Sequence, residues 1–231
     1  MISHYDWPGG REAMLRFGPA DGPVVVVALP LFEEANRTRA FAVTIMRMLA
    51  ERGIASALPD LPGTGESLVA TAQVTLADWR KAFGAAAASL GRPHTIAIRG
   101  GALVTLGANR TSSWIFAPVD GDSLVRDLQR ARQLAAPGAR SLFDLAMTAP
   151  AGTRTEAAGN ELSVDLLHFL VSAIPDRATP NRVVRLESDP GEANAKLPGA
   201  PLWRRTEPDN DPALATLLAD DIAAWVRQCE G

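Results

Sequence analysis

Cysteine and histidine are scarce in this chain of 231 residues, and their scarcity excludes several kinds of site. Cys229 is the only cysteine, so no disulfide can form within the chain and no thiolate cluster can hold a metal. The three histidines offer no pair at the spacing of a metal site. We therefore predict no metal site and assign no cofactor, and the single cysteine favours a cytoplasmic location.

Long hydrophobic runs and a strong excess of charge are also missing. The most apolar run, Val24 to Phe32, is interrupted by Pro30 and is too short to span a bilayer. The first residues show no basic stretch followed by an apolar run, so we expect no signal peptide. The 23 basic and 26 acidic side chains give a net charge of −3, which indicates neither nucleic acid nor an anionic membrane as a partner.

What the chain does contain is an alternation of strand-like and helix-like patterns. Residues 24–29 form a β-branched run that is typical of a strand buried on both faces. Further strands are predicted at Met14–Phe17, Ile54–Leu58, His94–Ile98, Ser113–Ala117, Arg182–Glu187 and Pro201–Arg204, and helices at Arg37–Arg52, Thr75–Leu90 and Pro212–Arg227. Strands that alternate with helices predict an α/β fold with a mostly parallel, doubly wound sheet.

The pattern changes between residues 121 and 180. A helix is predicted at Leu124–Leu134, and two short helical stretches follow within Ser141–Pro175. We expect this part to be a small helical insertion, or lid, within a single domain that covers residues 1–231. The Pro- and Gly-rich stretch Ser188–Ala200 is predicted to be a loop. The sequence leaves the oligomeric state open.

The turn after the second central strand carries the first resemblance to a known family. Residues 60–67 read Asp-Leu-Pro-Gly-Thr-Gly-Glu-Ser, which resembles the turn found at this place in α/β hydrolases. Its glycines allow a tight turn at the sheet edge, and Asp60 can accept hydrogen bonds from the N–H groups of the loop. Asp60 is therefore expected to stabilise the turn, whatever else it does.

A narrower resemblance rests on several blocks that occur in the same order. Residues 30–37, Pro-Leu-Phe-Glu-Glu-Ala-Asn-Arg, resemble the signature of the exosortase A system-associated hydrolases, in the branch called hydrolase 2. Weaker matches are Arg99–Leu103, Trp114–Val119, Gly159–Leu162 and Leu202–Pro208. The resemblance implies an α/β-hydrolase fold and a place beside exopolysaccharide and PEP-CTERM sorting loci, but it supplies no substrate.

The catalytic serine that this fold normally carries is absent. Hydrolases place it in Gly-x-Ser-x-Gly, on a strained turn between a strand and a helix. The corresponding residues 97–101 are Ala-Ile-Arg-Gly-Gly, so Arg99 stands where the nucleophile belongs. A guanidinium remains protonated at any working pH and cannot attack a carbonyl. Because Gly101 is retained, the turn itself is expected to persist.

The general base is absent as well. It should follow the last strand, but residues 205–210 contain no histidine. His4 precedes the first predicted strand, and His94 begins the strand that leads to Arg99, at the wrong end of the sheet. His168 lies in an apolar helix of the insertion, where packing is a more usual role than catalysis. Whether the chain is an enzyme therefore stays uncertain.

Two functional interpretations remain. In the first, the chain is a pseudoenzyme that acts as a binding or accessory protein for a small anionic or acyl ligand. The expected ligand-binding residues are Leu31, Phe32, Glu33, Glu34, Arg99, Gly100, Trp203 and Glu207. In the alternative, it is an atypical esterase or thioesterase, in which Arg99 stabilises an oxyanion and a carboxylate activates water. The possible carboxylates are Glu33, Asp60, Asp120 and Glu187.

The sequence also predicts the surroundings of Arg99. In this fold the turn that carries it faces the loop that begins at Pro30. That loop brings Glu33 and Glu34, and an unpaired charge in a partly dry pocket is costly, so we expect an acid to pair with Arg99. Glu33 and Glu34 are the best candidates, and Glu187 and Glu207 are the alternatives. Pro30 has no N–H group, but Leu31 and Phe32 can still donate backbone hydrogen bonds to an oxyanion.

Overall fold

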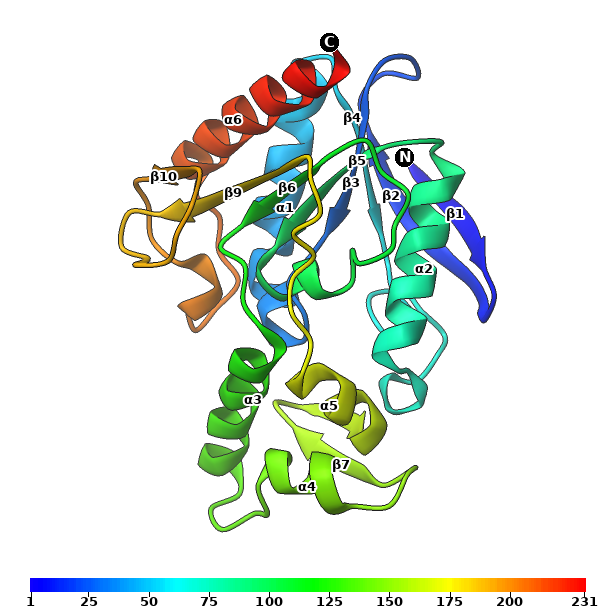
Figure 1. Cartoon of the computed structure of the whole chain (residues 1–231), viewed down its shortest axis with the longest axis vertical. Helices are drawn as coiled ribbons and strands as arrows, with labels where there is room; N and C mark the ends of the chain where they lie inside the picture. Colours follow the sequence, from blue (N-terminus) through cyan, green and yellow to red (C-terminus); the bar gives the residue numbers. More distant parts are fainter.

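The computed structural model describes residues 1–231, and an eight-stranded sheet runs through its centre (Figure 1). The strand order is β1-β2-β4-β3-β5-β6-β9-β10. The bounds are β1 Ile2–Trp7, β2 Gly10–Phe17, β3 Val24–Ala28, β4 Ala55–Pro59, β5 His94–Ile98, β6 Ser113–Phe116, β9 Asn181–Leu186 and β10 Ala195–Leu197. β1 and β2 form an antiparallel hairpin, and β2 is antiparallel to β4. All other neighbours are parallel, which confirms the mostly parallel sheet.

The central strands are apolar on both faces because helices cover both faces. Along β3, Val25 and Val27 point to one hydrophobic cluster, whereas Val26 and Ala28 point to the other. This division follows from the two-residue period of a strand. A strand with water on one face would alternate apolar and polar residues, so the continuous valine run already identifies a strand in the middle of the layers.

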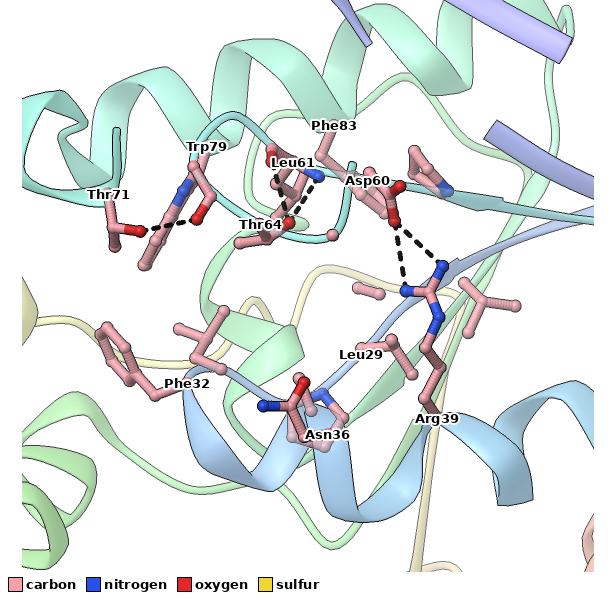
Figure 2. A pocket seen from close by; sticks show the side chains of 18 of the residues that line it. Leu29, Phe32, Asn36, Arg39, Asp60, Leu61, Thr64, Thr71, Trp79 and Phe83 are labelled. Atoms are coloured by element: carbon pink, nitrogen blue, oxygen red, sulfur yellow. Dashed lines mark hydrogen bonds and ion pairs between the residues drawn. The ribbon is translucent and has the colours of Figure 1, made fainter. Parts of the chain in front are cut away.

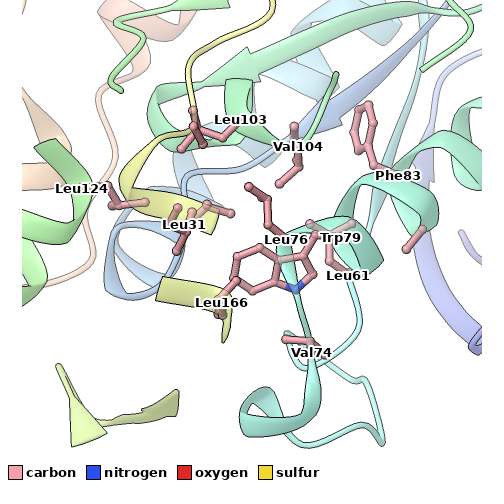
Figure 3. Packing of buried hydrophobic residues seen from close by; sticks show 14 of the residues in the cluster. Leu31, Leu61, Val74, Leu76, Trp79, Phe83, Leu103, Val104, Leu124 and Leu166 are labelled. Atoms are coloured by element: carbon pink, nitrogen blue, oxygen red, sulfur yellow. The ribbon is translucent and has the colours of Figure 1, made fainter. Parts of the chain in front are cut away.

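The covering helices are long and flank the sheet. α1 (Glu33–Glu51) and α6 (Pro212–Glu230) pack on one face, and α2 (Leu76–Ser89) packs on the other. α2 begins at a capping box in which Thr75 and Asp78 satisfy each other's backbone N–H groups. Its buried side chains, Leu76, Trp79 and Phe83, lie in the larger cluster (Figure 3). No helix combines the length and the apolar character needed to span a membrane.

The predicted insertion lies between β6 and β9 and extends from one end of the sheet (Figure 1). It contains α3 (Gly121–Ala135), α4 (Leu142–Thr148) and α5 (Val164–Val171). Between α4 and α5 it also forms a hairpin that the sequence pattern did not reveal, β7 (Arg154–Ala157) and β8 (Asn160–Ser163). The insertion starts just past the carboxyl end of β6, so it lies where ligands bind in open α/β sheets.

One predicted strand is wrong. Residues 202–204 form a 3₁₀ turn, η3, and the last strand is β10, inside the stretch that was predicted to be a loop. Leu202 and Trp203 are both buried, and two consecutive buried side chains suit a helical turn better than the edge of a sheet. α1 also begins four residues before the predicted Arg37, which brings both Glu33 and Glu34 into its first turn.

Candidate functional site

The turn after β5 has the geometry that a nucleophile elbow requires. β5 ends at Ile98, and Arg99, with a φ of 54°, is the first residue of the short helical turn η2 (Arg99–Leu103). A positive φ is uncommon for a residue with a side chain, and it marks strain that the surrounding structure must hold in place. An added Cβ at Gly101 would overlap the carbonyl oxygens of Ala28 and Leu29, so only glycine allows the turn to approach β3 so closely.

Arg99 is held on two sides. Its Nε and Nη2 donate to the two carboxylate oxygens of Glu34, at 3.2 and 2.9 Å. The guanidinium carbon lies 4.6 Å from the ring centroid of Trp203, within the range of a cation–π interaction. The side chains of Arg99 and Glu34 are only 11% and 13% exposed, so both charges are largely removed from water. The expected ion pair is therefore present, with Glu34 as the partner.

Glu33 faces a different arginine. Its carboxylate accepts a hydrogen bond from Nη2 of Arg37, one helical turn later, at 2.9 Å. Arg37 also donates to the backbone oxygen of Trp203 at 3.1 Å. Both acids at the start of α1 are therefore linked to Trp203 through an arginine. Glu34 pairs with Arg99, which lies over the indole ring, and Glu33 pairs with Arg37, which donates to the backbone oxygen.

The loop between β3 and α1 leaves two donors free. Neither Leu31 nor Phe32 donates its backbone N–H group to an acceptor within the protein. Phe32 has a φ of 58°, a left-handed conformation at the residue that precedes α1. Unpaired N–H groups at this place are the kind of donor that holds an oxyanion or a carboxylate.

These features border a cavity of about 600 Å³ between the elbow and the insertion. Six of the expected ligand-binding residues line it: Leu31, Phe32, Glu33, Glu34, Arg99 and Trp203. Gly100 and Glu207 do not line it. Gly100 lies behind the lining, next to Leu31 and Leu124, and Glu207 is exposed to solvent outside the cavity. We refer to this space as the elbow cavity.

The far wall of the elbow cavity comes from α3, a helix that the sequence predicts but does not place at the site. α3 contributes Leu124, Asp127, Leu128, Arg130, Ala131 and Leu134, and Arg37, Ala158 and Arg204 complete the lining. The spacing of Leu124, Leu128 and Ala131 is that of one helix face, so the signal was in the sequence. What the pattern could not show is that this face turns toward Arg99.

The remaining candidate carboxylates lie apart from the elbow cavity. Asp120 precedes α3 and is exposed, and Glu187 follows β9 and is exposed. Asp60 is 5% exposed, and its Oδ1 accepts two hydrogen bonds from Arg39 at 3.2 Å, while its Oδ2 accepts one from the backbone N–H of Glu66. Of the four candidates, only Glu33 lines the elbow cavity.

Asp60 instead belongs to a second cavity, of about 400 Å³ (Figure 2). Arg39 and Asp60 face each other at one side of this space, and Phe32 and Trp79 lie away from them. Leu31 and Phe32 line both this second cavity and the elbow cavity. The turn that the sequence predicts around Asp60 is therefore present. The carboxylate of Asp60 already accepts hydrogen bonds from Arg39 and from the backbone N–H of Glu66.

Solved structures of other proteins share the arrangement of strands and helices seen in this chain. The chain resembles Est1E from Butyrivibrio proteoclasticus at 15% identity, over 99% of this chain and 98% of that one, with a TM-score of 0.63. It resembles alpha/beta hydrolase domain-containing protein 10 from mouse at 14% identity over 99% of each chain, with a TM-score of 0.64. The chain has the α/β-hydrolase fold.

A third solved structure with the same fold belongs to a protein named for a different chemistry. The bottromycin epimerase BotH, in complex with bottromycin A2, is 16% identical over 97% of this chain and 99% of that one, with a TM-score of 0.56. No protein family model matches the chain, and no curated protein matches it in sequence. The α/β-hydrolase fold is shared among proteins of different activities, so the site must decide the function.

The α/β-hydrolase fold of this chain does contain a serine, a histidine and a carboxylate in a row, but at the opposite end of β5. His94 lies 2.8 Å from Oγ of Ser112 through Nδ1 and 2.9 Å from Oε1 of Glu230 through Nε2. Ser112 and His94 are 1% and 2% exposed, so a substrate carbonyl has no access to the hydroxyl. The row connects the last turn of α6 to the sheet.

His168 has no catalytic surroundings either. Its Nδ1 lies 3.1 Å from the backbone oxygen of Ala146, and its ring packs edge-on against Phe169. It therefore connects α5 to α4 within the insertion. His4 is exposed on β1, on the strand at the edge of the sheet.

Proposed function

We propose that this α/β-hydrolase-like protein binds a small ligand in the elbow cavity and does not hydrolyse it. The observation that carries the proposal is the state of Arg99. It occupies the nucleophile's position with the strained φ of an elbow, and Glu34 and Trp203 hold its guanidinium. A residue fixed in this way can shape a pocket, but it offers neither a nucleophile nor a proton acceptor.

The lining of the cavity indicates the chemistry of the ligand. Leu31, Phe32, Leu124, Leu128 and Leu134 offer an apolar surface. Arg204 lies on the rim without an acidic partner, whereas every other arginine of the lining is ion-paired. The free N–H groups of Leu31 and Phe32 add donors for an oxygen. A small acyl compound with an anionic or carbonyl group fits this combination.

We further propose that the protein belongs to the exosortase A system-associated hydrolases and is located in the cytoplasm. The support for the family is the run Pro30–Arg37 and the weaker blocks that follow it in order. In this view it serves an exopolysaccharide or PEP-CTERM sorting system as an accessory protein. The lone Cys229 supports an intracellular location.

The alternative of an atypical hydrolase needs a carboxylate that is free to activate water beside Arg99. Glu33 is the only one of the four candidates at the elbow cavity, and it is paired with Arg37. Glu34 also lines the cavity and is paired with Arg99. The geometry therefore favours ligand binding without hydrolysis, and an activity assay distinguishes this function from that of an atypical hydrolase.

The test combines a reactivity assay with a binding assay. We expect no serine to be labelled by a fluorophosphonate probe, and short-chain p-nitrophenyl esters to be hydrolysed at the background rate. Stoichiometric labelling, or turnover that Arg99→Ala abolishes, would overturn the proposal. For binding, hexanoate should shift the methyl resonances of Leu124 and Leu134, and Arg204→Gln should weaken this effect. Arg92→Gln, at an exposed arginine outside the cavity, is the matched control.

A further inference from the structure

A groove on the surface between α2 and α5 gathers apolar side chains that face water. Its volume is about 390 Å³, and it is lined by Leu76, Ala77, Arg80, Leu106, Phe169, Ser172, Ala173 and Ile174. Leu106, Phe169 and Ile174 are 43%, 54% and 68% exposed. Phe169 lies in α5 and Ile174 just after it, whereas Leu106 follows η2, so the apolar surface is shared by two segments far apart in the sequence. Large apolar side chains that meet around one hollow commonly mark an interaction site.

Arg80 supplies the only charge in this groove. Its Nε donates to the backbone oxygen of Leu103 at 3.0 Å, which fixes the plane of the guanidinium. No carboxylate pairs with it: Asp78 is engaged with Thr75 in the capping box, and Asp176 pairs with Arg110. Burial lowers the pKa of Arg80 below its ordinary value, and no acid opposes this effect. A partly desolvated cation without a counterion is a favourable place for an anion.

We propose that this groove binds a single-chain amphiphile with a carboxylate head, such as a medium-chain fatty acid. The carboxylate lies on the free Nη groups of Arg80, and the chain covers Leu106, Phe169 and Ile174. The volume is within the range of small-molecule sites. Association with an anionic bilayer normally uses a cluster of about four or more cations, whereas this groove offers one. The inference is independent of the elbow cavity, because the two share no residue.

Submicellar decanoate is the probe, with methyl-labelled protein to locate it. We expect decanoate to shift the resonances of Leu106 and Ile174. Decanol and decyltrimethylammonium have the same chain and no negative charge. Their affinity should be lower than that of decanoate by a factor of about ten or more. Arg80→Gln should reduce decanoate affinity by a similar factor, and Arg80→Lys should recover part of it. Arg92→Gln should change nothing.

Several outcomes would overturn the proposal. Equal affinity for decanoate and decanol in the unaltered protein would show that Arg80 does not hold the head, even if the Arg80 variants fail to fold. Shifts confined to Leu124 and Leu134 would place decanoate in the elbow cavity, which would support the proposed function and contradict this one. Binding to phosphatidylglycerol vesicles without binding of monomeric decanoate would identify a membrane surface as the occupant.

Discussion

The carboxyl end and the amino end of β5 hold different parts of what a serine hydrolase needs. At the carboxyl end there is an elbow, free backbone donors and a cavity of about 600 Å³, but Arg99 stands in place of the nucleophile. At the amino end Ser112, His94 and Glu230 are connected by hydrogen bonds in the order of a catalytic triad, but Ser112 and His94 are buried and out of reach of a substrate. Hydrogen-bond geometry alone therefore does not define a catalytic site, since a reaction also needs room for a substrate.

The largest expected effect concerns the carboxyl end. Arg99→Ala should lower the free energy of unfolding by about 3 kcal/mol, because it leaves Glu34 as an uncompensated, nearly buried charge. Glu34→Gln combined with Arg99→Ala should cost less than the sum of the two single changes. Urea denaturation of the four proteins measures both quantities. Additive losses would show that the pair contributes nothing. Arg99→Lys keeps the charge but loses the two-point contact. Its free energy of unfolding should lie between those of the unaltered protein and of Arg99→Ala.

A smaller effect is expected at the amino end. Ser112→Ala removes the partner of a ring nitrogen of His94, which is 2% exposed, and should destabilise the protein by about 2 kcal/mol. It should not change the binding of hexanoate to the elbow cavity. If Ser112→Ala instead abolished a measurable esterase activity, the amino end would be the catalytic one, and the comparison would be reversed.

The pH dependence of stability tests the same histidine. Burial lowers the pKa of His94 below its ordinary 6.5, and the hydrogen bond that its ring donates to the charged Glu230 only partly opposes this. The unfolded chain then binds a proton more tightly than the folded one, so the free energy of unfolding should fall as the pH drops below about 6.5. His94→Gln should flatten this part of the profile relative to the unaltered protein. An unchanged slope between pH 7 and 5 would mean that His94 does not contribute.

The smallest expected effect separates the two adjacent acids of α1. Glu33→Gln should cost only about 0.3 kcal/mol, because Glu33 and Arg37 form a half-exposed pair one helical turn apart. The contrast with Glu34→Gln, which removes the partner of a buried cation, should be large. Thermal melting of Glu33→Gln and Glu34→Gln under the same conditions compares their losses of stability. Equal losses would contradict the assignment of Glu34 as the partner of Arg99.

Much of the carboxyl end could be predicted from the sequence. The continuous valines of β3 and the turn at Asp60 are local signals, and they place the Pro30–Phe32 loop opposite the elbow. The pairing of Arg99 with one of two acids followed from that placement and from the cost of an unpaired charge. The choice between Glu33 and Glu34 did not, because it depends on where α1 begins, and α1 begins four residues before its predicted start.

The features that the sequence did not predict depend on contacts between segments that are distant in the chain. The wall that α3 contributes is set by how the insertion lies on the sheet, and no local period encodes that orientation. The row at the amino end joins His94 to residues 18 and 136 positions away, so no motif spacing could reveal it. The strand predicted at residues 201–204 is wrong because burial by the tertiary fold outweighs β propensity in so short a segment.

The loop between β3 and α1 forms a partition, because Leu31 and Phe32 line both the elbow cavity and the cavity beside Asp60. A partition cannot move toward one compartment without enlarging the other. We therefore expect a ligand that displaces Phe32 from one side to alter the affinity of the other side, and thermodynamic reciprocity then requires the same factor in both directions.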